Sequence, residues 1–455
     1  MKIAFLTLGC KVNSYETEKM KIQFEHAGHG IVSFSEKADV YVVNTCTVTN
    51  IADRKSRKML HRARRLNPEG IVVAAGCYVD SARQKGEVDS SVDVFLENKE
   101  KDHIVACIEK IAKEKGIPLT KEEGVQREKG GHTNISEEAT KEERTRAYIK
   151  VQNGCNQFCT YCIIPYVRGE LVSRPDEEIF QEVEKMAAQG YQEVVVTGIH
   201  LSSFGVDRGE GKLNANSFLE LEGKPLLDLL QGISQIEGIE RIRMGSLEPR
   251  IITDSFAKKL SEIPGICPHF HLSLQSGCDT VLKRMNRHYT AGEYLDGVRI
   301  LKKYFEHPAI TTDIIVGFPQ ETEEEFLATC DFAKEVAFAQ IHIFKYSRRQ
   351  GTIADQMEGQ VSEQIKSQRS DALMAIESQL EKQYQTYFMG REEEVLLEEV
   401  QEIQGKSYLV GYNERYVRIA IALEPGEEPL SRCNTIATVR IVGQIEDSIL
   451  EGKWK

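Results

Sequence analysis

The chain has 455 residues, 41% of them hydrophobic and 28% charged, which excludes a largely disordered protein and, at about 150 residues per domain, predicts two to four domains. Its net charge of −12 argues against a surface that binds nucleic acid throughout, so any such contact must be local. No stretch approaches the roughly 18 apolar residues that cross a bilayer, so we expect a cytoplasmic protein without a membrane span.

A small parallel α/β domain is predicted for residues 1–110. Three dense runs rich in β-branched residues have the composition of buried parallel strands, at 3–8, 40–43 and 71–75. Amphipathic segments follow the first two runs, at 15–27 and 52–66. This repeated strand–helix order is typical of a parallel sheet. The first run is too short to be the apolar part of an export signal, so we interpret it as a strand.

Residues 111–144 are rich in Lys, Glu and Gly and show little periodicity, so we expect a charged linker there. From 145 to 388 strands and helices alternate again, which predicts an open or partial (β/α) barrel with a long trailing helix over 361–388. The barrel strands are expected at 147–151, 193–197, 240–245, 269–274, 311–316 and 340–345. The barrel helices are expected near 176–189, 253–262, 291–304 and 322–336.

Short apolar runs separated by turn residues fill residues 389–455, which predicts a small all-β domain. The fold class is therefore α/β overall. A parallel α/β domain comes first, a partial (β/α) barrel follows, and a small β barrel ends the chain.

A compact cysteine motif follows the first barrel strand: Cys155, Cys159 and Cys162 have C-x3-C-x2-C spacing. The carboxyl ends of barrel strands are where sites form in this architecture. A structural zinc ion would need a fourth ligand and a second matched pair, and neither is nearby in the sequence. Three closely spaced thiolates instead suit a 4Fe-4S cluster with one open iron, so we favour a cluster over zinc.

Three more cysteines each come just after a predicted strand of the N-terminal domain: Cys10, Cys46 and Cys77. The carboxyl ends of parallel strands meet at one edge of a sheet, so these thiols are expected to lie close together, as a second cluster site requires. The alternative is three ordinary buried cysteines. Loop positions are poor places for core packing, which favours the cluster. The other five cysteines are expected to be core residues.

The segment VQNGCNQFCTYCIIPYVRGELVSR at 151–174 resembles the cluster motif of the radical S-adenosylmethionine methylthiotransferases. Further matches to this family are RIRMGSLEP at 241–249, LSLQSGCDTVLKRMNRHYT at 272–290, DIIVGFPQETEEEF at 313–326 and YSRRQGT at 346–352. The family's N-terminal domain is matched by GCKVNSYETE at 9–18, NTCTVT at 44–49 and AGCY at 75–78. The C-terminal domain resembles the TRAM domain, a small RNA-binding barrel. One departure is Gln320, where the family usually has glycine.

The resemblance implies cofactors and a reaction. It implies a 4Fe-4S cluster that binds S-adenosyl-L-methionine, held by Cys155, Cys159 and Cys162. It implies an auxiliary 4Fe-4S cluster held by Cys10, Cys46 and Cys77. In the implied reaction a 5′-deoxyadenosyl radical takes the hydrogen at C2 of a modified adenine, the auxiliary cluster delivers sulfur, and a second S-adenosylmethionine supplies the methyl group.

Within the family, GCKVN resembles the branch that acts on N6-threonylcarbamoyladenosine next to the tRNA anticodon. The implied partners are the anticodon stem-loop, an electron donor such as a flavodoxin or ferredoxin, and a sulfur source. Alternatives within the family are isopentenyladenosine tRNA and a ribosomal-protein aspartate as substrates. From other classes, a non-catalytic RNA-binding iron–sulfur protein and a zinc-stabilised RNA-binding protein stay open. No residue is identified as a catalytic acid or base.

Candidate contacts to the cofactor are Tyr161, the aromatic residue before the last motif cysteine, and three polar residues at predicted strand ends, Ser246, Glu248 and Gln275. The alternative is that the polar residues satisfy hydrogen bonds within loops. His200 and His271 are expected to be structural histidines.

Seven basic residues crowd one predicted helix, with no acidic residue from 54 to 65: Arg54, Lys55, Arg57, Lys58, Arg62, Arg64 and Arg65. A solvated helix face would explain them, but the helix directly follows the Cys46 loop, so we favour contact with RNA phosphates. The C-terminal domain has three basic and three aromatic residues that could grip RNA and stack on it: Lys406, Arg415, Arg418, Tyr408, Tyr412 and Tyr416. The alternative is that the tyrosines are core residues.

Overall fold

The computed structural model describes residues 1–86, 89–119, 145–208, 223–423 and 432–455. Packing divides these residues into two compact units. The first unit holds the described residues up to 119 together with Cys162–Gly169 and Ser347–Gly351, and the second holds the rest. Among the described residues, no helix is both long and apolar enough to cross a membrane. Most of the predicted linker, 120–144, lies outside the described residues.

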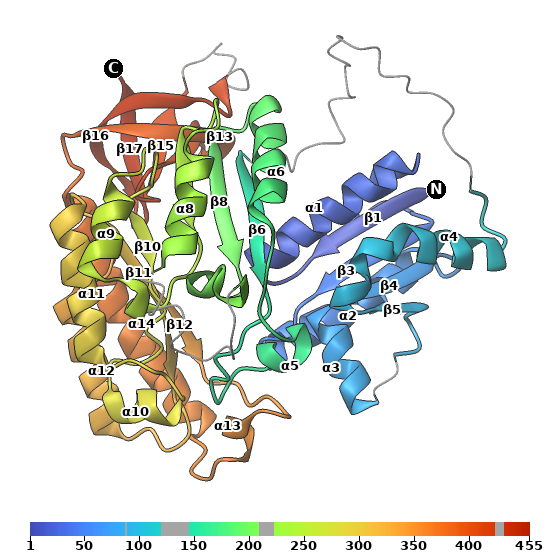
Figure 1. Ribbon diagram of the computed structural model, residues 1–455, viewed down its shortest axis with the longest axis horizontal. Coiled ribbons are helices and arrows are strands. Elements are labelled where there is room, and N and C mark those ends of the chain that lie inside the picture. The colour runs from blue at the N-terminus through green and yellow to red at the C-terminus, as the bar shows by residue number, and fades with distance from the viewer. Residues whose placement is uncertain (87–88, 120–144, 209–222, 424–431) are drawn as a thin grey trace. The chain divides into compact units, whose positions relative to one another are not determined.

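A parallel sheet forms the centre of the first unit, where the described strands run in the order β2-β1-β3-β4-β5 (Figure 1). The strands are β1 (Lys2–Thr7), β2 (Gly30–Val32), β3 (Val40–Thr45), β4 (Ile71–Gly76) and β5 (Val94–Leu96). Every residue of β3 and β4 is buried, as expected for central strands with both faces covered.

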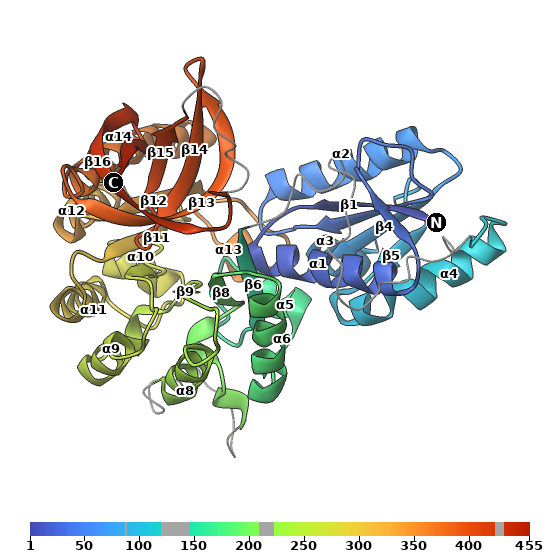
Figure 2. The ribbon, with the colours of Figure 1, turned by 90° about the horizontal axis from the view of Figure 1, so that it is seen from above.

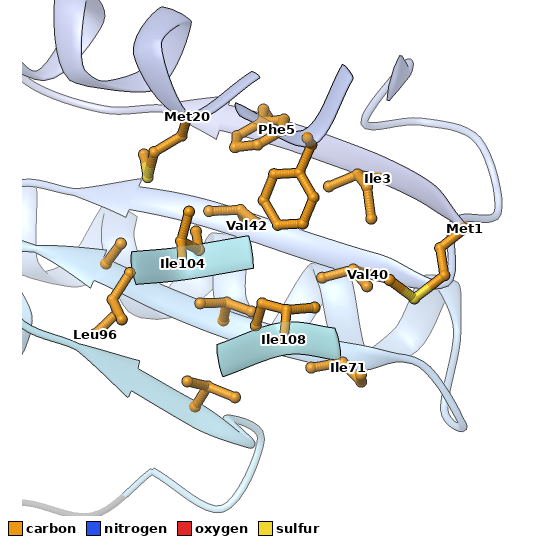
Figure 3. Close-up of a cluster of buried hydrophobic side chains, with 14 of the residues drawn as sticks. Met1, Ile3, Phe5, Met20, Val40, Val42, Ile71, Leu96, Ile104 and Ile108 are labelled. Carbon is orange, nitrogen blue, oxygen red and sulfur yellow. The ribbon is translucent and has the colours of Figure 1, made fainter. Parts of the chain in front are cut away.

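Helices cover both faces of this sheet. They are α1 (Lys11–His26), α2 (Asn50–Leu66), α3 (Cys77–Lys85) and α4 (Ile104–Glu114). On one face Ile104 and Ile108 of α4 and Met20 of α1 pack against Val40 and Val42 of β3 (Figure 3). Helices α2 and α3 pack on the other face. Since α4 continues to Glu114, the predicted domain boundary at 110 falls inside a helix.

Six parallel strands form an open arc in the described part of the second unit, which confirms the predicted partial barrel (Figure 2). They are β6 (Arg146–Asn153), β8 (Glu193–Gly198), β9 (Arg241–Met244), β10 (His269–His271), β11 (Ala309–Val316) and β12 (Gln340–Lys345). A short strand, β7 (Val172–Ser173), pairs antiparallel with β6. The arc consists of two sheets. Single bridges, such as the one between Leu247 and Leu272, connect these sheets where β9 meets β10.

Helices lie along the outside of this arc (Figure 2). They are α6 (Asp176–Ala188), α8 (Lys224–Ile233), α9 (Asp254–Ser261), α11 (Ala291–Tyr304) and α12 (Glu323–Val336). The trailing helix is α14 (Glu363–Thr386). Only α8 was not expected from the sequence among these helices.

The C-terminal strands that the structure describes close into a small barrel in the order β13-β14-β15-β17-β16. They are β13 (Glu392–Ile403), β14 (Lys406–Asn413), β15 (Arg418–Ala422), β16 (Ile436–Glu446) and β17 (Ile449–Trp454). The predicted all-β domain is thus a closed barrel, and it packs in the same unit as the (β/α) arc.

Buried arginines join the small barrel to the arc. Arg243 of β9 donates to the carbonyl oxygen of Glu414 at 2.8 Å and pairs with Glu193 at 2.7 Å. The rings of Tyr412 and Tyr416 stack at 4.6 Å, and the guanidinium of Arg243 lies over Tyr416 at 4.8 Å. These two tyrosines therefore pack at the contact between barrel and arc, which favours the core interpretation over RNA stacking.

Candidate functional site

Three cysteines of the first unit lie at the carboxyl ends of neighbouring strands. Cys10 is the N-cap residue of α1 after β1, Cys46 follows β3 directly, and Cys77 begins α3 directly after β4. Because β1, β3 and β4 are adjacent and parallel, these positions share one edge of the sheet. Cys10 is exposed, Cys46 is half-buried and Cys77 is buried.

The loops that carry these cysteines are packed tightly together. Gly9 has a φ of +104°, and a Cβ atom there would lie 2.8 Å from the Cβ and 3.0 Å from the Sγ of Cys46. Only glycine fits this close approach with a positive φ. The Asn13 side chain donates to the carbonyl oxygens of Leu8 at 2.7 Å and Thr45 at 2.9 Å, and so ties the ends of β1 and β3 together.

The thiols also act on one another electrostatically. Burial raises the pKa of the Cys46 thiol to about 11; a hydrogen bond with the backbone of Val48 opposes this, and the charges of Cys77 and Cys10 add to it. A thiol with this pKa is protonated at neutral pH unless a metal ion binds it as the thiolate. The structure thus brings the three predicted N-terminal cysteines together in surroundings that suit metal ligation.

A buried guanidinium lies beside this group. Arg168, in α5 (Ile164–Arg168), donates from Nε to the Sγ atom of Cys77 at 3.3 Å and from Nη2 to the Asn13 side-chain oxygen at 2.8 Å. Its Nη1 donates to Glu16 at 2.9 Å. Burial disfavours the charge of Arg168, but the attraction of Cys77 and Glu16 outweighs it and raises the pKa of the guanidinium.

Sequence reasoning missed Arg168, and it also missed the buried cation beyond it. Lys101 donates to Glu16 at 2.5 Å and to the Asn44 side-chain oxygen at 3.0 Å. Glu16 therefore lies between two cations in the interior of the first unit. The only signal in the sequence was the position of Arg168 at the end of the largely apolar run 163–167.

A second buried arginine holds the loop after Cys46. Arg349 donates to Asp53 at 2.7 Å, to the Asn50 side-chain oxygen at 2.9 Å and to the Thr47 hydroxyl at 2.5 Å. The Thr47 hydroxyl in turn donates to Asp53 at 2.6 Å. Arg349 comes from the YSRRQGT segment, so a distant part of the chain fixes the start of α2.

The compact motif lies on the loop after β6. Arg287 donates from Nη1 to the Sγ atom of Cys159 at 3.1 Å. Its Nε donates to the Tyr289 hydroxyl at 2.9 Å, and that hydroxyl donates to the Leu274 carbonyl oxygen at 2.9 Å. Burial raises the pKa of the Cys155 thiol to about 12. Cys162 is half-buried and starts the segment that packs in the first unit.

The donor sets fit iron–sulfur chemistry. Each set offers three soft thiol ligands, as iron–sulfur clusters require, and each has an arginine N–H group directed at one sulfur. Such hydrogen bonds stabilise thiolate ligands and tune the potential of a cluster. The residues that would hold a first cluster are Cys155, Cys159 and Cys162, and those that would hold a second are Cys10, Cys46 and Cys77.

The candidate cofactor contacts differ in how far their side chains are exposed to solvent. Ser246 is exposed, and half-buried Tyr161 packs edge-on against Phe318 with ring centroids 6.5 Å apart. Gln275 is buried with a φ of +70°, and its backbone N–H group donates to the Asp313 carbonyl oxygen at 2.8 Å. Among these residues, Ser246 offers the most accessible polar group.

The Glu248 carboxylate is engaged within the protein. It accepts from His200 at 3.0 Å and from Arg250 at 2.5 Å. Burial raises its pKa, but the hydrogen bond and charge of His200, with help from Arg287 and Arg250, lower the pKa of Glu248 to about 2. This arrangement fits the structural alternative for Glu248 and the structural role expected of His200.

The basic residues of α2 are mostly open to solvent. Five are exposed: Arg54, Lys55, Lys58, Arg62 and Arg65. Arg57 and Arg64 are half-buried. Arg64 donates to the carbonyl oxygens of Pro68 at 2.9 Å and Gly70 at 2.8 Å and pairs with Asp93, so its guanidinium stabilises the loops around α2.

Family models and a solved structure match large parts of this chain. A family model described as Radical SAM superfamily matches residues 149–333, and one described as Uncharacterized protein family UPF0004 matches residues 2–97. Among solved structures, the radical S-adenosylmethionine methyltransferase TsrM from Kitasatospora setae has a TM-score of 0.52 at 16% identity, over 78% of this chain and 77% of that chain. This likeness shows a shared fold.

Curated relatives are much closer in sequence. The threonylcarbamoyladenosine tRNA methylthiotransferase MtaB of Bacillus subtilis is 39% identical, over 92% of this chain and 89% of its own length. The protein of the same name from Aquifex aeolicus is 36% identical over 92% and 100%. The tRNA-2-methylthio-N6-dimethylallyladenosine synthase of Pelotomaculum thermopropionicum is 32% identical over 90% of each chain. The chain belongs to the radical S-adenosylmethionine tRNA methylthiotransferase family.

Proposed function

We propose that this enzyme adds a methylthio group to C2 of N6-threonylcarbamoyladenosine next to the tRNA anticodon. The observation that carries the choice of nucleoside is the pattern of relatives. Two relatives named for threonylcarbamoyladenosine reach 39% and 36% identity over 92% of this chain, whereas four relatives named for dimethylallyladenosine reach 32–33% over 86–90%.

The compact motif supplies the radical step. Cys155, Cys159 and Cys162 would hold a 4Fe-4S cluster, which together with S-adenosyl-L-methionine would supply the chemistry that removes a hydrogen atom from carbon. Arg287 compensates the negative charge of the Cys159 thiolate, and Tyr289 holds that guanidinium in place. Tyr161 gives the loop an apolar anchor against Phe318. Ser246 and Gln275 are the polar groups we assign to the cofactor.

The N-terminal cysteines supply the sulfur step. Cys10, Cys46 and Cys77 would hold an auxiliary 4Fe-4S cluster that would supply the sulfur atom, and a second S-adenosylmethionine would supply the methyl group. Gly9 allows the Cys10 and Cys46 loops to approach, and Asn13 fixes the distance between them. Arg168 places a positive charge beside the Cys77 thiolate, which lowers the cost of holding several negative sulfur ligands in a buried site.

The substrate is a polyanion, and the exposed basic side chains of α2 are the groups we assign to its phosphates. These side chains lie on the helix that begins four residues after Cys46, so contacts there position the RNA near the sulfur donor. The reaction consumes electrons and sulfur. We assign the supply of electrons to a small carrier such as a flavodoxin or ferredoxin, and the supply of sulfur to a separate sulfur source.

Iron and acid-labile sulfide content tests the two-cluster assignment. The protein is purified and reconstituted without oxygen, in parallel with a Cys155→Ala/Cys159→Ala/Cys162→Ala variant. Roughly eight irons in the parent and four in the variant are expected. About four in the parent and none in the variant would leave Cys10, Cys46 and Cys77 as core thiols and refute the sulfur step.

Product analysis tests the choice of substrate. Anticodon stem-loop RNAs that carry N6-threonylcarbamoyladenosine, N6-isopentenyladenosine or unmodified adenosine are each incubated with the reconstituted enzyme, S-adenosylmethionine and a reductant. Mass spectrometry of the nucleosides is expected to show a methylthio product on the first RNA. Efficient conversion of the second RNA instead would assign the protein to the sister substrate.

A further inference from the structure

A polar cluster lies on the face of the arc opposite its helices. On β11, Thr312 is fully buried, and its hydroxyl and that of Tyr294 in α11 both donate to the Leu272 carbonyl oxygen, at 2.6 Å and 3.1 Å, so Thr312 points toward the helical layer. Successive residues of a strand point to opposite faces, which directs Asp313 to the other side. The same alternation on β12 buries Ile341 and leaves His342 exposed.

Three side chains meet on this face: His271, Asp313 and His342. One ligand atom from each lies within 4.8 Å of the others. The Nε2 atom of His271 is 3.4 Å from the Asp313 carboxylate, and the rings of His271 and His342 stack with centroids 5.8 Å apart. Asp313 and His342 are also paired in register across β11 and β12.

The side chains of this cluster are held in position, yet they stay accessible to solvent. The Nδ1 atom of His271 lies 3.0 Å from the Thr311 hydroxyl, a hydrogen bond that fixes the ring and directs Nε2 toward Asp313. The side chains of His271 and Asp313 are 13% and 31% exposed. The cluster therefore presents imidazole and carboxylate groups on a surface that a ligand can reach.

The cluster is next to a residue that we assign to the cofactor. Gln275 follows His271 by four residues, and its backbone N–H group donates to the Asp313 carbonyl oxygen at 2.8 Å. A molecule bound against Gln275 would therefore lie close to Asp313 on the neighbouring strand. In a barrel enzyme such a position suits part of the substrate.

We propose that His271, Asp313 and His342 bind the polar substituent on N6 of the substrate adenosine, an inference that rests on the proposed function. A threonylcarbamoyl group carries a carboxylate, a hydroxyl and urea N–H groups. The imidazole of His342 donates to the carboxylate, and Asp313, oriented by His271, accepts from the hydroxyl or a urea N–H group. An apolar isopentenyl substituent would displace water from these polar groups without offering a hydrogen bond in return, so the cluster discriminates against it.

Binding and turnover of the three stem-loop RNAs test this proposal with the full-length, reconstituted enzyme. The variants are His342→Ala and Asp313→Asn, and the matched control is Gln340→Ala, an exposed residue two positions before His342 on β12. For the threonylcarbamoyl RNA, His342→Ala is expected to raise Kd and to lower kcat/KM, each about tenfold or more. The unmodified RNA is expected to bind the variant and the parent equally, and the control is expected to match the parent throughout.

The outcomes separate the inference from the function on which it rests. If the parent modifies the threonylcarbamoyl RNA selectively and both variants retain that selectivity, the polar cluster does not recognise the N6 substituent. If the parent itself shows no preference for this RNA, the proposed function fails, and the inference fails with it. Zinc or additional iron that is bound by the parent and lost in His342→Ala, measured by elemental analysis, would overturn the proposal in favour of a metal site.

Discussion

The Nε atom of Arg168 lies 3.3 Å from the Sγ atom of Cys77, in a side chain that is completely buried. A positive N–H group directed at a ligand sulfur stabilises the reduced, more negative form of an iron–sulfur cluster. Under the proposed function Arg168 would therefore act on the second cluster through Cys77, as a positioning residue.

Replacement of Arg168 is expected to lower the midpoint potential of the auxiliary cluster. One hydrogen bond to a charged group contributes about 1.5 kcal/mol, which for one electron corresponds to about 60 mV. The measurement is a redox titration followed by electron paramagnetic resonance, in the Cys155→Ala/Cys159→Ala/Cys162→Ala background so that one cluster remains. Arg168→Gln is expected to show the shift and Arg168→Lys a smaller one.

Arg83→Gln is the control for this experiment, since that side chain is 70% exposed and pairs with Glu97 in the same unit. An unchanged potential in Arg168→Gln, with full iron content, would show that the guanidinium only packs against Glu16 and Asn13.

Arg349 is expected to be required for a stable Cys46 loop. Its side chain is 3% exposed and pairs with Asp53, so Arg349→Ala leaves a buried carboxylate without this cation. Breaking such a pair costs about 3–5 kcal/mol. We expect Arg349→Ala to lower the free energy of unfolding and to lower the iron content of the auxiliary site, whereas exposed Arg348→Ala retains both. Full iron content in Arg349→Ala would mean that the loop holds its shape without this anchor.

The apolar runs in the sequence were sufficient to predict β1, β3 and β4 of the sheet and the six parallel strands of the arc, because a buried parallel strand has a dense apolar run such as 71–75. The three-residue strands β2 and β5 were not predicted. The same logic placed Cys10, Cys46 and Cys77 at one sheet edge, where the structure brings them together. Arg168 and Arg349 could not be found in this way. Both pack in the first unit although they lie far along the chain, and no local pattern encodes which distant carboxylate an arginine pairs with.

His271 shows a second limit of the sequence. It was expected to be structural, and its Nδ1 hydrogen bond to Thr311 alone would fit that role. Its partners Asp313 and His342 belong to two other strands, 42 and 71 positions further along the numbering. Only the register of β10, β11 and β12 reveals the cluster.

The buried Glu248 carboxylate is expected to make stability depend on acid pH. Its pKa is lowered to about 2 from an ordinary 4.5, so its contribution is fully present above about pH 5 and is lost as the pH falls toward 2. The contribution is about 3 kcal/mol at neutral pH. Chemical unfolding of the parent and Glu248→Gln between pH 7 and pH 3 measures it. The difference in the free energy of unfolding between them should shrink as the pH falls, and a constant difference would contradict the assignment.

The exposed basic residues of α2 are expected to hold RNA phosphates. Each phosphate contact that is removed lowers the slope of log K against log salt concentration by about one. We expect Lys55→Ala and Arg62→Ala to weaken binding of all three stem-loop RNAs equally, since phosphates carry no information about the modified base. Lys258→Ala on α9, an exposed lysine outside the proposed RNA surface, is the control. If the α2 variants bind with the parent's affinity and salt slope, the charges of this helix are a solvated face and the RNA binds elsewhere.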